Sequence, residues 1–583
     1  MIKINGKNVL IAGIWLFVIS ILIYTRFINL GWGLPYPMHP DERNMANALQ
    51  QLQCEIRNSK FEIRNCFNPH FFAYGQFPLY LGYVIVFFLK FFDGDLRMPI
   101  SFQEATISLR IISAVASIIN AIIIIKIIKV ITKKITYLLS LISYLLIIFS
   151  PYAIQFSHFG TTESLLMLLY SLIVYLSMQI LESHTTSEVV YLAIASGLAT
   201  ATKISSAIFL VVPVIALISN IKNQKLKLHI KIQKSLIINF SFVFFAFMFT
   251  ILFSPHNFIN LQDFVSAIRY ESDVALGKIA VFYTKQFFNT APIWFQLTKV
   301  FPFALGWPVY IFGTLGFFKL NWKDKKINLL RFAFLVYFIP TAMIYAKWSR
   351  FMAPILPLIL IFAILFILNI KNKISKIHIK NQKFYILICH FAFYILIFTI
   401  IIPGFAYLYI YQNPDVRFQA SDWIYKNIPN NSYILSETAN VVDIPISNGT
   451  MKQLNNYNVI SFNFYDLDEN PELQSELKNY LQKADYIFVP SRRIFANHTC
   501  YINDKLQITN NNSITNNKCQ ILKQKYPILN KYYDDLFSGK LGFTKVAEFS
   551  AGLNDEQAEE TWTVFDHPVI RIYKKAKSLR FFY

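Results

Sequence analysis

Long apolar runs separated by short basic loops are the feature that most constrains how this chain can fold. The first run, VLIAGIWLFVISILIY, covers residues 9–24, and runs of similar character recur as far as residue 410. An uncharged apolar run of this length can cross the hydrocarbon core of a bilayer as a helix. Apolar residues make up 55% of the 583 residues and charged residues only 15%, which excludes an ordinary soluble globular protein.

About eleven stretches are predicted to span the membrane as helices. They cover residues 8–28, 107–131, 135–152, 162–182, 189–202, 204–220, 235–254, 300–318, 327–346, 353–370 and 384–410. The two short stretches 189–202 and 204–220 are predicted to form a tight helical hairpin. The first stretch has no small-residue cleavage site, so we expect a retained span rather than a signal peptide.

A further apolar run at residues 77–92 is interrupted by Lys90 and decides the orientation. If this run does not cross, the basic loops at 129–134, 221–234, 319–326 and 371–383 share one side with the N-terminus. The positive-inside rule therefore favours a run that lies in, or dips into, the outer interface. The N-terminus is then cytoplasmic and the C-terminus external. The formal net charge of +22 reflects these loops and not nucleic-acid binding.

The chain changes character after about residue 410. A helix is predicted near 416–427, followed by strand-like SYILSE, ADYIFVP, GFTKVAEFS and PVIRIYKK. Residues 411–583 are therefore predicted to form a small external α/β domain, separate from the transmembrane domain at 1–410.

Four of the five cysteines fall in segments predicted to be external. Cys54 and Cys66 lie in the first loop, and Cys500 and Cys519 lie in the C-terminal domain. An oxidising compartment favours two local disulfides, Cys54–Cys66 and Cys500–Cys519, over four free thiols.

Ionisable side chains collect at the predicted external ends of the spans. They are His39, Asp41, Glu42, Arg43, His158, Glu163, Lys203, His256, Arg269, Glu271, Lys347 and Arg350. Their occurrence at one membrane face is typical of a site at the membrane–water boundary.

Each of these residues also has a purely structural interpretation. The PDE at 40–42 fits the first turn of a helix, with Pro at N1 and acids favoured by the helix dipole. Lys203 could snorkel from a span end, and Arg350 could anchor the interface. His158 and His256 could be hydrogen-bonded loop residues.

A lipid-linked phosphate donor would use such a set of residues. Lys203 and Arg350 can hold its phosphate, and Asp41 can act as a base toward an acceptor hydroxyl that attacks the anomeric carbon. Nearby carboxylates would stabilise an oxocarbenium-like transition state. A divalent metal (Mg, Mn or Zn) bound by Asp41 or Glu42, with Glu163 and the histidines, is one option; the sequence does not decide it.

These residues resemble a known enzyme family. HPDE after the first span, SLRIISAVASIINAIIIIKI with Arg110, SPYAIQFSHFGTTESLLMLLY, GLATATKISSAIFLVVP and KWSRFMAPILPLI occur in the order seen in polyprenyl-phosphate-sugar-dependent glycosyltransferases of the GT-C fold. The chain is most similar to bacterial relatives of the protein O-mannosyltransferases, glycosyltransferase family 39, and to the lipid A aminoarabinose transferases. The resemblance implies that residues 1–410 form a GT-C transmembrane catalytic domain.

The resemblance also implies roles for individual residues. Asp41 takes the place of the catalytic acid of the first loop, with Glu42 beside it, and Glu163 matches a second acidic position. Lys203 and Arg350 resemble donor-phosphate contacts, while Arg43, His158 and His256 are expected to bind substrate. The aminoarabinose transferases carry a Lys in the first loop before the apolar run, where this chain reads YGQFPLY with Gln76, which puts a lipid A substrate in doubt.

The expected function is therefore an inverting transfer of a hexose or related sugar from a polyprenyl-phosphate donor to a lipid, glycan or protein acceptor. The expected location is a plasma membrane, such as a bacterial inner membrane, with membrane lipid as a partner. The alternative is a lipid-linked-sugar flippase without transferase activity. A flippase would favour internal repeats and ionisable groups near the midplane, whereas the charges here lie at one face.

Overall fold

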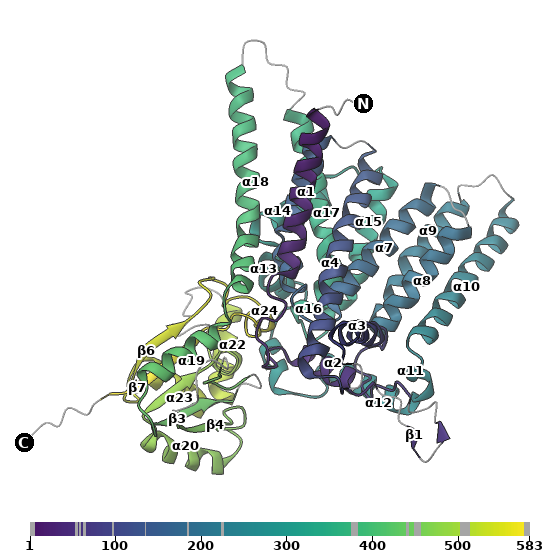
Figure 1. Cartoon of the computed structure of the whole chain (residues 1–583). Coiled ribbons are helices and arrows are strands. Elements are labelled where there is room, and N and C mark those ends of the chain that lie inside the picture. The colour runs from purple at the N-terminus through teal and green to yellow at the C-terminus, as the bar shows by residue number, and fades with distance from the viewer. Residues whose placement is uncertain are drawn as a thin grey trace, which may run out of the picture.

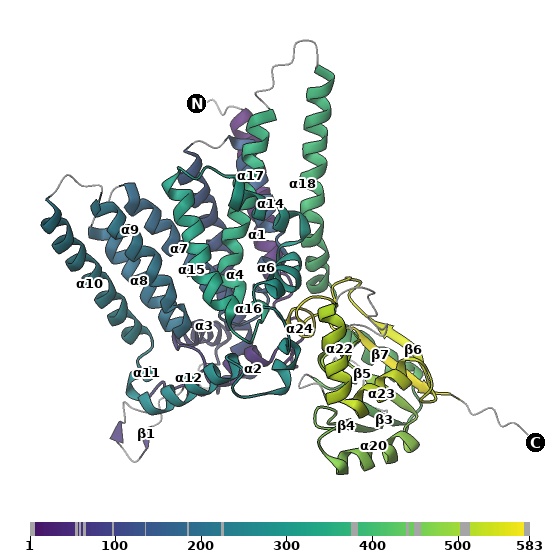
Figure 2. The ribbon, with the colours of Figure 1, turned by 180° about the vertical axis from the view of Figure 1, so that it is seen from behind.

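The structure is a computed structural model in which a bundle of long helices carries a sheet domain at one end (Figure 1). It describes residues 6–52, 56–57, 60–61, 66–95, 98–133, 136–182, 186–222, 227–374, 383–438, 442–447, 456–501 and 513–576. Helix α1 (Gly6–Phe27) begins at the opposite end of the bundle from the sheet domain in both views (Figures 1 and 2).

The predicted spans coincide with the apolar helices of the bundle. These are α1 (Gly6–Phe27), α4 (Phe102–Thr132), α5 (Tyr137–Ile148), α7 (Glu163–Glu182), α8 (Thr186–Thr202), α9 (Val211–Lys222), α10 (Leu228–Phe253), α14 (Trp307–Lys319), α15 (Lys325–Met343), α17 (Leu356–Ile374) and α18 (Lys383–Gln412). In the described part of the chain, seven helices are long and apolar enough to cross a membrane, and three apolar helices are shorter. The predicted polytopic helical class is confirmed.

Two predicted spans are not single straight helices. The stretch at 300–318 is a bent pair, Gln296–Leu305 and Trp307–Lys319, with an angle of 115° between them. Gly306 makes this bend, since its φ of 77° lies in the region that favours glycine. The stretch at 135–152 ends early, because Pro151 starts a separate short helix, α6 (Pro151–Gln155).

The run at 77–92 forms helix α3 (Phe77–Asp93), which lies across the end of the bundle rather than along it (Figure 1). Its Lys90 is buried and pairs with Glu104 at 2.9 Å, while Phe88, Phe91 and Phe92 are exposed. An amphipathic helix with this orientation fits a position in the membrane interface, which is the position that the distribution of basic loops predicts for this run.

Several short elements share this end of the bundle with α3. They are α2 (Pro40–Gln50), β1 (Ile56–Arg57), β2 (Lys60–Phe61), η1 (Ile204–Leu210), α11 (His256–Ile259), α12 (Leu261–Ala275), η2 (Phe282–Phe287), η3 (Gln296–Val300), α13 (Phe301–Leu305), α16 (Ser349–Met352) and η4 (Ala353–Ile355). These connecting elements, called the floor of the bundle below, surround the candidate site.

The C-terminal domain is a five-stranded sheet of order β4-β3-β5-β7-β6 with helices packed on it. Its elements are α19 (Val416–Asn427), β3 (Tyr433–Glu437), β4 (Asn458–Phe462), α20 (Pro471–Lys483), β5 (Tyr486–Val489), α21 (Phe495–His498), α22 (Ser513–Lys525), α23 (Pro527–Phe537), β6 (Phe543–Phe549), α24 (Glu560–Thr563) and β7 (Ile570–Lys575). Strands β4, β3 and β5 run parallel, and β7 and β6 run antiparallel to their neighbours. The four predicted strands and the helix at 416–427 are present, whereas β4 was not predicted.

A disulfide joins Cys500 and Cys519, which is one of the two predicted pairs. Cys66 is also disulfide-bonded. The other predicted pair includes Cys54, which lies outside the described residues.

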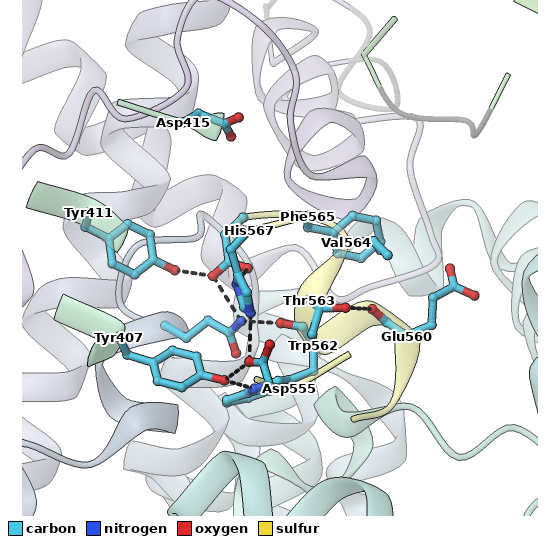
Figure 3. Close-up of polar contacts among 12 residues, drawn as sticks. Tyr407, Tyr411, Asp415, Asp555, Glu560, Trp562, Thr563, Val564, Phe565 and His567 are labelled. Atoms are coloured by element: carbon cyan, nitrogen blue, oxygen red, sulfur yellow. Dashed lines mark hydrogen bonds and ion pairs between the residues drawn. The ribbon is translucent and has the colours of Figure 1, made fainter. Parts of the chain in front are cut away.

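A buried imidazole–carboxylate network fastens the sheet domain to the bundle (Figure 3). The Nδ1 of His567 lies 2.5 Å from Asp566 Oδ1, and its Nε2 lies 2.9 Å from Asp555 Oδ2. Tyr411 donates its hydroxyl to Asp566 and Tyr407 donates its hydroxyl to Asp555, each at 2.7 Å. Both tyrosines belong to α18, so the network ties the last membrane helix to the loop before β7.

The imidazole at the centre of this network carries a positive charge. Burial alone lowers the pKa of His567, but the carboxylates of Asp566 and Asp555 outweigh burial and raise its pKa to about 10. Because this value lies above that of the unfolded chain, about 6.5, the stabilisation is fully present below about pH 6.5. It is lost as the pH rises toward about 10.

We expect His567→Gln to destabilise the docked sheet domain by about 3–5 kcal/mol, because it leaves two buried carboxylates without their cation. Thermal unfolding of the full chain in detergent should show the largest difference from wild type near pH 6 and a smaller one toward pH 10. Lys545→Gln, which breaks an exposed pair with Glu548, is the matched control and should change little. A difference that does not depend on pH would contradict this account.

Candidate active site

The candidate site lies at the end of the bundle that carries the sheet domain, the end at which α2, α12 and α16 are found (Figures 1 and 2). The start of α7 and the hairpin tip at Lys203 reach the same end. Four of the predicted residues, Asp41, Glu163, Lys203 and Arg350, are thereby brought to one region.

Glu42 lies in a buried ion pair with Arg110 of α4. Arg110 donates from Nε and Nη2 to the two carboxylate oxygens of Glu42, both at 2.7 Å. It also donates to the carbonyls of Leu30 and Trp32, at 2.7 and 2.6 Å, and the Gly160 amide donates to Glu42 at 2.6 Å. This pair pins α2 to α4, so Glu42 holds the site together; its predicted catalytic role finds no support in the geometry.

Asp41, the neighbour of Glu42, points the other way and forms an ion pair with Arg350 of α16. The two side chains are 19% and 20% exposed, so this pair remains accessible. The guanidinium of Arg350 lies 4.7 Å from the centroid of the Trp348 ring, which restricts its position. Within the described residues, Nε of Arg350 is buried without a hydrogen-bond partner.

His39 caps the helix that carries Asp41. Its Nδ1 accepts a hydrogen bond of 3.2 Å from the Asp41 amide, and its ring packs against Phe159 and against Phe565 from the sheet domain. Burial, together with the positive charges of Arg350 and other arginines, holds the pKa of His39 well below its usual range. The ring is therefore neutral and available as an acceptor at the N-terminus of α2.

Lys203 sits at the junction of α8 and η1 with aromatic rings around its ammonium. The ammonium lies 5.0 Å from the Tyr74 ring and 5.2 Å from the Phe351 ring. The negative charges of Glu163 and Glu271 act on it, but no carboxylate of the described residues pairs with it directly. Such a cation retains donors for an incoming anion.

Gly75 allows the loop that carries Tyr74 to pack against this junction. Its amide donates to Thr202 O at 2.9 Å. A Cβ at Gly75 would lie only 1.9 Å from Ala201 O, so any larger residue would push Tyr74 away from Lys203.

A cavity of about 380 Å³ lies beside these groups. Its polar lining includes Lys203, Arg350 and Glu271. The rest is mostly apolar and includes Leu166, Ile204, Ile208, Ala275, Leu276, Pro340, Ile344, Trp348, Phe351 and Pro354. The cavity thus combines two cations with an apolar wall, which suits an anionic headgroup that is attached to a lipid chain.

Glu163 is buried at the start of α7, and no hydrogen bond or ion pair to it occurs among the described residues. Together with Glu271 of α12, it balances the charge of Lys203. Burial raises the pKa of Glu271, and the positive charge of Lys203 opposes this effect.

The two histidines that were predicted to bind substrate, His158 and His256, have hydrogen-bond partners within the protein. His158 stacks on Tyr411 at 3.8 Å, and its ring nitrogens face the carbonyls of Ile154 and Ile28. His256 faces Asn260 and the carbonyl of Cys66. Both rings therefore have structural contacts, and their substrate-binding roles stay predictions.

Two other polar residues of the first loop also lie outside the cavity lining. Arg43 is half-buried on α2 and does not line the cavity. Gln76 is fully buried, where it accepts from the His256 amide at 2.9 Å and donates to Asn257 at 3.2 Å. Gln76 thus joins the first loop to α11 instead of facing a phosphate.

The predicted metal ligands do not form a metal site in this geometry. Asp41 forms an ion pair with Arg350, and the negative charge of Glu163 interacts with the ammonium of Lys203. In the part of the chain that is described, no three His, Cys, Asp or Glu side chains are grouped so as to hold a metal ion. This donor set does not fit a divalent cation, and no step below is routed through one.

The aromatic walls and the contribution of the sheet domain were not predicted from the sequence. Tyr74, Trp348 and Phe351 surround the cations, and Phe565 reaches His39 from more than 500 residues along the chain. Only the position of Trp348 and Phe351 beside Arg350 in the KWSRF motif could have signalled this role.

Comparison with known proteins adds family evidence. Residues 95–250 match the family model described as dolichyl-phosphate-mannose-protein mannosyltransferase. Over this segment the chain is similar to that family of glycosyltransferases. The match confirms the predicted resemblance; it contains Arg110, Glu163 and Lys203, whereas Asp41 and Arg350 lie outside it. No match was found among curated proteins.

Solved structures of similar arrangement include three glycosyltransferase systems. The oligosaccharyltransferase of Archaeoglobus fulgidus covers 84% of this chain and 71% of its own, at 10% identity and a TM-score of 0.47. ArnT from Cupriavidus metallidurans covers 74% and 82%, at 10% identity and 0.44. The S. cerevisiae protein O-mannosyltransferase Pmt1-Pmt2 complex covers 45% and 35%, at 15% identity and 0.31. At such TM-scores these likenesses carry no conclusion about the site.

We expect Glu42→Gln to lower the free energy of unfolding by about 3–5 kcal/mol, because it leaves Arg110 as an uncompensated buried charge. Asp41→Asn, which alters a more exposed pair, should cost about 1 kcal/mol or less. Thermal unfolding of both variants in detergent compares the two adjacent acids directly. If Glu42→Gln unfolds like wild type but is inactive, Glu42 acts in the chemistry after all.

Proposed function

We propose that the chain transfers a hexose or related sugar, with inversion, from a polyprenyl-phosphate donor to an acceptor hydroxyl at the external membrane face. The observation that carries this proposal is the cavity beside Asp41, which joins the cations Lys203 and Arg350 to an apolar wall. A polyprenyl phosphate offers the matching chemistry, an anion attached to an apolar chain. We infer a GT-C fold for residues 1–410 and treat residues 411–583 as the external domain.

Two solved structures of similar arrangement hold lipid phosphates, but the proposal for this chain rests on its own cavity and not on them. One similar structure is ArnT bound to undecaprenyl phosphate, and another is an archaeal oligosaccharyltransferase with dolichol phosphate and an inhibitory peptide. A further structure of the latter enzyme carries an acceptor peptide. For this chain we propose the lipid phosphate as the donor carrier and a lipid, glycan or protein as acceptor.

The residues support a single displacement. Asp41 takes the proton from the acceptor hydroxyl as its oxygen forms a bond to the anomeric carbon of the sugar. The bond from that carbon to the phosphate oxygen breaks, and the electron pair leaves with the lipid phosphate. Lys203 and Arg350 stabilise the charge on the departing phosphate.

In this mechanism, the ion pair between Asp41 and Arg350 controls when the Asp41 carboxylate is available as a base. While Arg350 is paired with Asp41, the carboxylate is held by a cation and is a weaker base. A donor phosphate competes for the same guanidinium, and its arrival releases Asp41 toward the acceptor. The base is therefore freed only when the donor is in place.

We expect Asp41→Asn to reduce turnover about 10²–10⁴-fold while donor affinity is retained or improved. Lys203→Ala and Arg350→Ala should instead weaken donor binding. The measurement is transfer from a short-chain polyprenyl-phosphate sugar, read by mass spectrometry across an acceptor panel, together with donor affinity. Asp263→Asn and Lys278→Ala, exposed on or beside α12, are matched controls that should leave both values unchanged. If Asp41→Asn turns over like wild type, the acid pair only starts a helix.

A further inference from the structure

Helix α12 turns one face toward the cavity of about 380 Å³ that contains Lys203 and Arg350, called the donor cavity below. The lining residues that α12 contributes are Ile268, Glu271, Ser272 and Ala275. Positions 268, 271 and 275 are three and four residues apart, a spacing at which residues lie on the same side of a helix. Glu271 is exposed as well as part of the lining, which places it at the opening of the donor cavity.

The C-terminal end of α12 is fixed to the segment that leads into α16. The Ala346 amide donates to the carbonyl of Ala275 at 2.9 Å. Gly277 packs so closely on Tyr345 that a Cβ at Gly277 would lie 2.7 Å from Cγ of that ring. Since α16 carries Arg350, these backbone contacts set where Glu271 stands relative to that cation.

The carboxylate of Glu271 is available to a ligand. Among the described residues no hydrogen bond or ion pair engages it, although its negative charge acts on Lys203. The positive charge of Lys203 in turn favours the ionised carboxylate. An ionised carboxylate accepts hydrogen bonds and donates none, so a ligand of Glu271 must carry hydrogen-bond donors.

A carboxylate at this position opposes the binding of a bare phosphate, because the two negative charges repel each other. The cations of the donor cavity and Glu271 are therefore suited to different parts of one ligand, a phosphate and a group with hydrogen-bond donors. A sugar joined to the phosphate supplies these donors as hydroxyl groups. The hydroxyl of Ser272, beside Glu271 in the lining, can both donate to them and accept from them.

We propose that Glu271 binds hydroxyl groups of the donor sugar and selects sugars that carry no acidic group. The inference rests on the proposed function, because it takes the ligand of the donor cavity to be a polyprenyl-phosphate sugar. Hydroxyl groups that donate to an ionised carboxylate form charge-assisted hydrogen bonds. The carboxylate of a uronic acid would face Glu271 as a like charge, so such a donor is disfavoured.

The test compares affinities for short-chain polyprenyl phosphates with three headgroups, measured by isothermal titration calorimetry on the full-length protein in detergent. The first lipid carries the phosphate alone. The second carries a glucosyl, mannosyl or galactosyl group on the phosphate, and the hexose that wild type binds most tightly is used. The third carries the uronic acid of that hexose.

Glu271→Gln should weaken binding of the hexosyl lipid about tenfold, because hydrogen bonds to a charged group are lost. It should leave binding of the bare phosphate unchanged or tighter, since a negative charge beside the cations is gone. Wild type should prefer the hexosyl lipid to the uronic acid lipid, and Glu271→Gln should reduce this preference. Asp263→Asn is the matched control, because it removes an exposed acid of the same helix that lies outside the cavity lining. It should bind all three lipids like wild type.

Equal binding of the hexosyl lipid by wild type and Glu271→Gln would overturn the inference, as would a preference of wild type for the uronic acid lipid. The same loss of affinity for bare phosphate and hexosyl lipid would overturn it too, because Glu271 would then only position Lys203. In each of these cases wild type still binds the lipid phosphate, and the proposed function is retained. If wild type binds none of the three lipids, the proposed function fails and the inference fails with it.

Discussion

The bidentate pair between Arg110 and Glu42 is the interaction on which the candidate site depends. A guanidinium buried in the helical bundle requires full hydrogen bonding, and Glu42, Leu30 and Trp32 satisfy it. Because Glu42 is fixed toward α4, its neighbour Asp41, about 100° further around the helix, is directed to another side of α2, toward Arg350. The adjacent acids in HPDE therefore have different partners, Arg110 for Glu42 and Arg350 for Asp41, and the chemical role is proposed only for Asp41.

The second constraint is the docking of the sheet domain. His567, held between two carboxylates and two tyrosines of α18, places the loop at residues 555–567 against the floor of the bundle. From that loop Glu559 accepts from the Ser349 amide beside Arg350, and Phe565 covers His39. The sheet domain thus contributes to the surroundings of both members of the Asp41–Arg350 pair.

The sequence made the membrane bundle and much of the site predictable. Apolar runs and basic loops locate the helices because bilayer thickness and the positive-inside rule act on composition alone. Asp41, Lys203 and Arg350 were singled out because they lie at one predicted membrane face and in motifs that resemble a known family, and the structure places Arg350 beside both Asp41 and the cavity of Lys203. The bend at Gly306 and the strand β4 were missed, since an apolar run does not reveal its own bend and a short edge strand has little pattern.

The sequence does not reveal that Asp41 and Glu42 have different partners. It also does not reveal which groups contact His158 and His256. These contacts depend on which carbonyl or cation each side chain meets in space. The most direct test of the central claim is a double-mutant cycle of Asp41→Asn and Arg350→Ala, with affinity measured for a short-chain polyprenyl phosphate. The account predicts that Asp41→Asn tightens binding more with Arg350 present than without it, with a coupling of about 0.5–3 kcal/mol. Effects that add independently would contradict the proposed competition for Arg350.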